Sequence, residues 1–170
     1  MLDEKIHSED AQHVVETPRV IIRKCTVAEI EAQPNFIELQ EEYMDECALE
    51  DLPRPSPRME TYKNIEGTGA LTVFGAFIDN KLIGYATLLA YVSRHYDLEL
   101  PLTETIFVAK SLRKTGAGIK LIHQVENLAA SLGFPALLII APLGGSLAEI
   151  LPYLGYKPTN MIFVKRLPHA

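Results

Sequence analysis

The sequence predicts an α+β fold in which helices flank a mixed, mostly antiparallel central sheet. Two apolar, β-branched runs at 71–78 and 81–92 are separated by Asp79 and Asn80, which is typical of a hairpin with a tight turn. Apolar residues then recur at helical spacing over 118–132. The expected order of elements is β, α, α, β, β, β, α, β, α, β. Strands and helices do not alternate regularly in this order, which is typical of an α+β fold.

The N-terminal region predicts an arm, a strand and a short helix. Residues 1–18 are mostly polar and show no clean periodicity, so we expect a flexible arm followed by a single domain over 19–170. A strand is expected at 20–22. A helix is expected to start at Thr26, because Glu29 three residues later completes a capping box.

A second helix is expected to begin at Asn35, which has Glu38 three residues later, and to end near Leu49. One face carries apolar residues, and the other carries five carboxylates: Glu38, Glu41, Glu42, Asp45 and Glu46. A run of this kind is either a solvated face or a rim that attracts a cation to a nearby site. The proline-rich loop 51–58 follows it.

The second half of the chain predicts three further strands and a short helix. A strand is expected at 104–109, and an almost wholly apolar run at 134–141 favours a strand buried on both faces. A Ser-x-x-Glu capping box at 146–149 predicts a short helix, and 161–165 predicts the last strand.

Composition excludes several classes of protein. A chain of 170 residues suits one domain, and a net charge of −6 argues against a nucleic-acid-binding surface. Cys25 and Cys47 have no CxxC spacing, and the five histidines form no HxH or HxxxH pair, so we expect reduced thiols and no metal. Neither a secretory signal nor an apolar membrane span is visible, so the expected location is cytoplasmic and no membrane contact is expected.

The segment Arg113-Lys-Thr-Gly-Ala-Gly118 carries the strongest functional signal. It lies between a predicted strand and a predicted helix, where unpaired N–H groups and the helix dipole form an anion site. The Walker A pattern fails because the chain has no Gly-Lys pair, and the dinucleotide pattern fails because Leu121 occupies its third glycine position.

This segment resembles the acyl-CoA-binding motif (Q/R)-x-x-G-x-(G/A) of the GNAT superfamily of N-acyltransferases, with Arg113, Gly116 and Gly118 at the motif positions. Leu154-Gly-Tyr156 and the run 161–167 are similar to the family's closing segment. The resemblance implies the GNAT fold, whose sheet splays at the strands before and after the CoA-binding helix. It also implies an N-acetyltransferase that moves an acetyl group from acetyl-CoA, its co-substrate, to a primary amine of a small molecule or peptide by direct attack in a ternary complex.

The resemblance assigns the cofactor-binding residues by position. The backbone of Phe107 and Val108 would pair with the pantetheine arm like an added strand. The N–H groups of the turn and helix start would hold the pyrophosphate. The CoA-binding set is Phe107, Val108, Arg113, Lys114, Thr115, Gly116, Ala117, Gly118 and Ile119.

The positions of the acid and the base follow the family pattern less closely than the CoA-binding positions do. Glu104 is the candidate base, since many family members carry an acidic residue at this point; a solvent-facing or substrate-orienting role is the alternative. Leu151 stands where the family often has the tyrosine that protonates the thiolate, and Gly144 stands where it often has Asn. Tyr96 is a weak candidate for that acid, while Tyr153 and Tyr156 are expected to pack.

Three hypotheses about function follow. The first is the N-acetyltransferase, with an unidentified amine acceptor, a cationic one included, held by the first two helices and the loops between strands. The second is a non-catalytic or weakly active CoA-binding or regulatory protein on the same fold, favoured by Leu151. The third is a peptide-modifying enzyme whose acidic helix steers a basic peptide. The family also includes many dimers, so a homodimer is a candidate assembly.

Overall fold

The computed structural model describes residues 18–93 and 97–167. The expected arm at 1–18, except Pro18, lies outside these residues, as does Tyr96. The strands are β1 (Ile21–Cys25), β2 (Leu71–Ile78), β3 (Lys81–Ser93), β4 (Leu98–Thr103), β5 (Ile106–Val108) and β6 (Leu138–Ile139). The helices are α1 (Val27–Glu31), α2 (Phe36–Cys47), α3 (Met59–Gly67), α4 (Ala117–Ser131) and α5 (Ser146–Ile150), with 3-10 helices η1 (Lys110–Thr115) and η2 (Leu151–Leu154).

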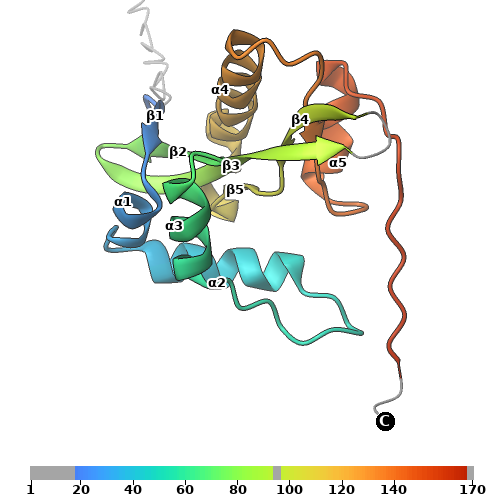
Figure 1. The fold of residues 1–170 in the computed structure, drawn as a ribbon. Helices are drawn as coiled ribbons and strands as arrows, with labels where there is room; N and C mark the ends of the chain where they lie inside the picture. Colours follow the sequence, from blue (N-terminus) through green and yellow to red (C-terminus); the bar gives the residue numbers. More distant parts are fainter. Residues whose placement is uncertain (1–17, 94–96, 168–170) are drawn as a thin grey trace, which may run out of the picture.

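The strands form one mixed sheet in the order β1-β2-β3-β4-β6, and β5 pairs separately with β3. All pairings are antiparallel except that of β4 with β6. Helix α4 covers one face of the sheet, and α1, α2 and α3 lie on the other (Figure 1). The α+β prediction, with a mostly antiparallel sheet between helices, is confirmed.

Local sequence signals place several elements correctly. The Thr26 hydroxyl accepts the Glu29 N–H at 3.0 Å, and the Glu29 carboxylate accepts the Thr26 N–H at 2.7 Å, which completes the expected capping box. Asp79 and Asn80 have φ of 47° and 63°, the left-handed values of a tight hairpin turn. Asn35 differs from the expectation: its side chain does not cap α2 but donates to the Leu82 carbonyl at 2.8 Å, which ties α2 to β3.

The core has one cluster on each face of the sheet. Leu82 and Phe107 belong to the cluster under α1 and α2, while Leu121 and Val125 belong to the cluster under α4, and none is more than 2% exposed. Burial of such a side chain stabilises the fold by about 1.5–3 kcal/mol. Leu132, expected on the buried stripe of α4, is 61% exposed because it lies one residue beyond the helix end.

Two predictions in the middle of the chain were wrong. Helix α3 was missed because it has no side-chain cap and no buried residue, so it leaves little local signal. The strand expected at 104–109 is only the three residues of β5, and β4 precedes it within the segment expected to be a connection. Glu104 and Thr105 separate the two strands.

The C-terminal part departs most from expectation. The run 134–141, expected to be buried on both faces, has no buried residue, because β6 lies at the edge of the sheet. The strand expected at 161–165 pairs with none of the residues that the structure describes, and the Ser146 box does not form, since Gly145 is the N-cap of α5. Figure 1 shows residues 157–167 running away from the sheet.

Candidate active site

The turn that connects η1 to α4 presents a group of unpaired backbone donors. Gly116 ends η1 in the left-handed region, with φ of 78°, and α4 begins at the next residue. Lys120 is the first residue of α4 whose N–H reaches an acceptor one turn back, the Gly116 carbonyl at 3.1 Å. Within the part of the chain that the structure describes, the N–H groups from Gly116 to Ile119 therefore have no acceptor, and they point beyond the positive end of the helix dipole.

The two glycines keep this turn accessible. A Cβ atom on Gly116 would have no neighbour within 4 Å, so its positive φ, and not crowding, is what requires glycine. A Cβ on Gly118 would meet only Val108 Cγ2, at 3.9 Å, which is ordinary contact. Packing inside the protein therefore does not demand glycine at 118, whereas close approach of a ligand to the N–H groups does benefit from it.

Arg113 braces the turn instead of lying free beside it. Its Nε donates to the Val108 carbonyl at 3.0 Å, and its terminal nitrogen forms an ion pair with Glu46 of α2. The sequence predicted that its charge would lie beside an anion; in the structure that charge is paired. Lys114 is exposed and forms none of the ion pairs among the described residues, so it remains the cation available at the turn.

The acidic face of α2 is largely occupied by partners. Arg54, from the proline-rich loop, pairs with Glu41 at 2.6 Å and Asp45 at 2.7 Å. Glu42 accepts the backbone N–H of Lys110, and Glu46 binds Arg113. Four of the five carboxylates thus tie α2 to neighbouring segments, which differs from both a purely solvated face and a free cation-attracting rim.

The sheet opens next to the glycine turn at Gly116. β6 pairs with β4 through Leu102 and Thr103 only, and Ile140 N–H donates to the Thr103 carbonyl at 2.9 Å. β5 pairs with β3 and not with β6, so the sheet splays beyond Thr103. The Thr103 hydroxyl is fully buried and has no partner among the described residues, which favours a ligand or water at the point of separation.

In the described ranges, one edge of the β5 backbone pairs with β3, and the other, its free edge, pairs with no strand. Ala109 N–H donates to Ile83, and the Thr105 carbonyl accepts from Thr87, both on β3. Backbone groups alternate in direction along a strand, so those of Phe107 also face β3, while those of Ile106 and Val108 face the other way. The Val108 carbonyl on that side accepts from Arg113 Nε, which leaves the Val108 N–H and the groups of Ile106 directed at the gap.

Glu104 is exposed and lies at the break between β4 and β5. Burial raises the pKa of Tyr62 in α3, and the negative charge of Glu104 raises it further. The next residue, Thr105, has its hydroxyl 3.2 Å from that of Tyr43, so the break between β4 and β5 borders the side of the sheet covered by α1, α2 and α3.

An aromatic hollow of about 50 Å³ lies on this side, between α1, α2, α3 and the sheet. Tyr43, Tyr62 and Tyr85 line it together with Thr105, whose hydroxyl lies 3.2 Å from that of Tyr43. Burial raises the pKa of Tyr43 to about 12 and also raises that of Tyr85, so both phenols stay neutral at ordinary pH. Sequence reasoning missed this hollow because Tyr62 lies on the helix that was not predicted.

A sequence model described as the acetyltransferase (GNAT) family matches residues 35–143 of the chain. This range includes α2, the strands β2 to β5, the glycine turn and α4. The chain belongs to the GNAT acetyltransferase family.

Solved structures share the GNAT fold with this chain. An aminoglycoside acetyltransferase from an uncultured soil metagenomic sample, in complex with sisomicin, is 18% identical, with a TM-score of 0.65 over 88% of this chain and 97% of that chain. A ribosomal-protein-alanine N-acetyltransferase from Brucella melitensis biovar Abortus 2308 is also 18% identical, with a TM-score of 0.65 over 88% of this chain and 100% of that chain. An aminoglycoside N-acetyltransferase in complex with CoA is 18% identical, with a TM-score of 0.64 over 91% and 98% of the two chains. No curated protein sequence matches the chain.

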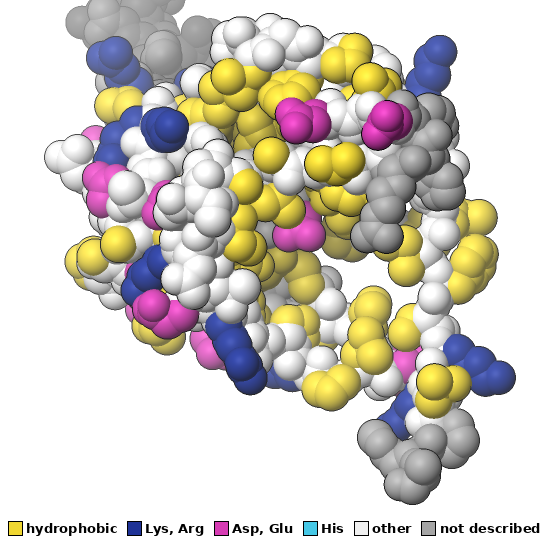
Figure 2. Space-filling view, viewed as in Figure 1, with side chains coloured by type: hydrophobic (Ala, Val, Ile, Leu, Met, Phe, Trp, Pro, Cys, Tyr) yellow, Lys and Arg dark blue, Asp and Glu magenta, His cyan; other side chains and the backbone are white. Residues whose placement is uncertain are grey.

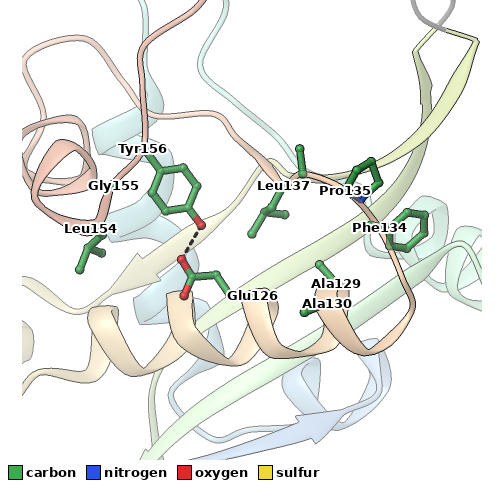
Figure 3. A pocket seen from close by; sticks show the side chains of 10 residues that line it. Glu126, Ala129, Ala130, Phe134, Pro135, Leu137, Leu154, Gly155 and Tyr156 are labelled. Carbon is green, nitrogen blue, oxygen red and sulfur yellow. Dashed lines mark hydrogen bonds between the residues drawn. The ribbon is translucent and has the colours of Figure 1, made fainter.

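The closing segment of this GNAT chain departs from the packing expected for it. Leu151 is 8% exposed and is a buried apolar residue, while Tyr153 is 89% exposed and does not pack as expected. Tyr156 does pack: its hydroxyl donates to Glu126 Oε1 at 2.8 Å across a hollow of about 310 Å³ (Figure 3). This hollow borders the C-terminal half of α4, so it is distinct from the turn at the start of that helix.

No cluster of three or more His, Cys, Asp or Glu residues in the described ranges is arranged to hold a metal ion. No helix in those ranges is long and apolar enough to span a membrane.

Proposed function

We propose that the chain is an N-acetyltransferase that transfers an acetyl group from acetyl-CoA to a primary amine of a small molecule or peptide, by direct attack in a ternary complex. The observation that carries the proposal is the set of unpaired N–H groups from Gly116 to Ile119, placed at a helix start beside a gap in the sheet. Membership of the GNAT acetyltransferase family supports the same class of reaction.

The pyrophosphate of CoA binds at the glycine turn. The N–H groups of Gly116, Ala117, Gly118 and Ile119 donate to it, and the exposed ammonium of Lys114 adds charge. Thr115 supports the turn from within, because its hydroxyl donates to the Leu112 carbonyl at 2.6 Å. Arg113 contributes by holding η1 to β5 and α2.

The pantetheine arm lies along the free edge of β5. The backbone groups of Ile106 and the N–H of Val108 are directed at the gap, so an extended arm can pair with them as an added strand does. Phe107, assigned to this role with Val108 by position, has its backbone directed at β3 and supports the edge through its buried ring. An N–H of this edge also polarises the thioester carbonyl as negative charge develops on its oxygen.

Glu104 accepts the proton of the attacking amine, directly or through a water molecule. The amine nitrogen forms a bond to the thioester carbon, the carbon–sulfur bond breaks, and its electron pair leaves on the CoA thiolate. The thiolate then takes a proton from solvent or from Tyr96. Leu151, being buried and apolar, does not supply it.

The acceptor approaches from the side of α1, α2 and α3, where the aromatic hollow is lined by Thr105, the residue next to Glu104. The lining is mainly apolar and its phenols are neutral, so it suits an apolar part of the acceptor next to the amine. The paired carboxylates of α2 give little support to steering of a basic peptide.

A thiol-release assay with acetyl-CoA and a panel of amines, polyamines and peptides tests the proposal. Turnover with at least one amine is the expected result. CoA binding without turnover across the panel would instead favour a non-catalytic CoA-binding protein, for which buried Leu151 is the supporting observation.

Glu104→Gln tests the base directly. We expect kcat/KM to fall by about 10²-fold or more, with CoA affinity unchanged, because the amide cannot accept the proton. Glu149→Gln makes the same change on exposed α5 and should leave kcat/KM unaltered. If Glu104→Gln stays within about twofold of the unaltered protein at every pH, the base assignment is wrong.

A further inference from the structure

The 3-10 helix η1, which leads into the glycine turn, is tied to α2 near both of its ends. At its start, the carboxylate of Glu42 accepts the backbone N–H of Lys110, and near its end Arg113 forms the ion pair with Glu46. Lys110 Nζ also lies 3.6 Å from a Glu46 carboxylate oxygen. Glu42 and Glu46 are four residues apart in α2, so they project from the same side of that helix.

η1 has little support of its own. It extends over six residues, whereas 3-10 runs longer than about three or four residues are uncommon, because their hydrogen-bond geometry is poor. None of its residues is buried, and its N-cap residue, Ala109, makes no side-chain hydrogen bond. Leu112 packs on the core but is only partly buried. The contacts with α2 therefore contribute much to fixing the position of η1.

The ion pair of Glu46 with Arg113 differs from those on the open surface. Its side chains are 26% and 35% exposed, whereas Glu60, which pairs with Lys63 on α3, is 79% exposed. Figure 2 shows acidic and basic side chains next to one another on this outer face, over α1 and α3. Water screens such exposed pairs, so they add little to stability, while a partly buried, hydrogen-bonded pair contributes more.

We propose that Glu42 and Glu46 are positioning residues for CoA: they hold η1 so that the N–H groups from Gly116 to Ile119 point at one pyrophosphate. Neither carboxylate touches the ligand, because each acts through η1. The inference rests on the proposed function, since it takes the glycine turn to be the CoA site.

The sign of the effect separates positioning from electrostatics alone. A carboxylate near an anion site repels the phosphates, and Glu46 also neutralises Arg113. Charge by itself therefore predicts that Glu46→Ala binds CoA more tightly. If the carboxylate positions the turn, the same variant binds CoA more weakly, because it releases the end of η1 that leads into the turn.

Calorimetric titration with CoA measures this sign. We expect Glu42→Ala and Glu46→Ala each to weaken CoA binding about tenfold, the usual effect of losing a hydrogen bond to a charged group. Glu38→Ala is the matched control. It removes the same charge one turn before Glu42, from an exposed side chain that forms none of the ion pairs of the described residues, and it should leave CoA affinity unaltered.

A double-mutant cycle shows whether Glu46 acts through its partner. In the background of Arg113→Gln, Glu46→Ala should weaken CoA binding by no more than about twofold further, because the ion pair is already lost. A tenfold loss in both backgrounds would mean that Glu46 does not act through Arg113, and the proposal would be wrong.

Hydrogen exchange of the chain without ligand tests the support of η1 separately. In the double variant Glu42→Ala/Glu46→Ala, the amides of 110–115 should exchange faster, while those of 121–131 in α4 keep their rate. Unchanged exchange in 110–115 overturns this inference alone, as does CoA binding by Glu46→Ala that equals or exceeds that of the unaltered chain. An unaltered chain that does not bind CoA would overturn the proposed function, and the positioning role with it.

Discussion

β5 and β6 flank the same gap, but they are held in place by different means. β5 pairs with β3, and Phe107 and Val108 are 2% and 6% exposed between the two core clusters. β6 has two paired residues, and no strand in the described part of the chain pairs with its outer edge. Packing within one chain thus holds the β5 side, with α4 and its turn, in place. The same packing covers the β6 side only in part. The binding machinery that we propose lies mainly on the packed side.

The largest expected difference between the two sides is in stability. Leu121→Ala removes a fully buried side chain from under α4 and should lower the free energy of unfolding by about 2–5 kcal/mol. Leu143→Ala, beyond β6, removes a side chain that is 91% exposed and should change it by no more than about 0.5 kcal/mol. Urea unfolding of both variants at one protein concentration measures this. Similar losses would show that the β6 side is packed as firmly as the β5 side.

The next effect is on CoA binding. Gly116→Val should weaken CoA binding about 100-fold or more, which is about 2.7 kcal/mol, because the side chain would enter the space in front of the N–H groups. Gly133→Val is a matched control at the other end of α4: its φ of 80° is close to the 78° of Gly116, and neither has a neighbour within 4 Å of a Cβ.

Both valine variants should lose similar stability through strain in the left-handed region. Calorimetric titration with CoA and thermal unfolding separate the two effects. Equal CoA affinity in the two variants would remove the turn from the binding site.

The smallest effect concerns Tyr43, which holds Thr105 between β4 and β5. Tyr43→Phe removes the hydroxyl that lies 3.2 Å from the Thr105 hydroxyl, and it should lower the free energy of unfolding by about 1 kcal/mol at neutral pH. Burial raises the pKa of Tyr43 from 10.0 to about 12, so its contribution to stability is present below pH 10 and is lost as pH rises to about 12. The unaltered chain should therefore lose stability more steeply over this range than the variant. Equal slopes, measured by urea unfolding from pH 9 to 12, would contradict the burial of this phenol.

Several elements could be predicted because their signals are short-range. The capping box of Thr26 and Glu29, the turn at Asp79 and Asn80, and the glycine turn at Gly116 all act within a few residues. The family resemblance, which rests on the same turn, is confirmed by the match over residues 35–143. The roles of Glu104 and of the CoA-binding residues stay predictions.

The sequence by itself determined the α-helices other than α3, where the hairpin turns, and where a glycine turn begins a helix. The tertiary structure alone decided that the strand at 104–109 breaks at Glu104, that Arg113 is paired with Glu46, and that the apolar run around β6 lies at an edge. The physical reason is range: caps and turns are satisfied within about one turn of chain, while strand partners and ion pairs come from residues far away in sequence. An apolar pattern states that a strand needs neighbours, but only the assembled sheet shows whether one chain provides them.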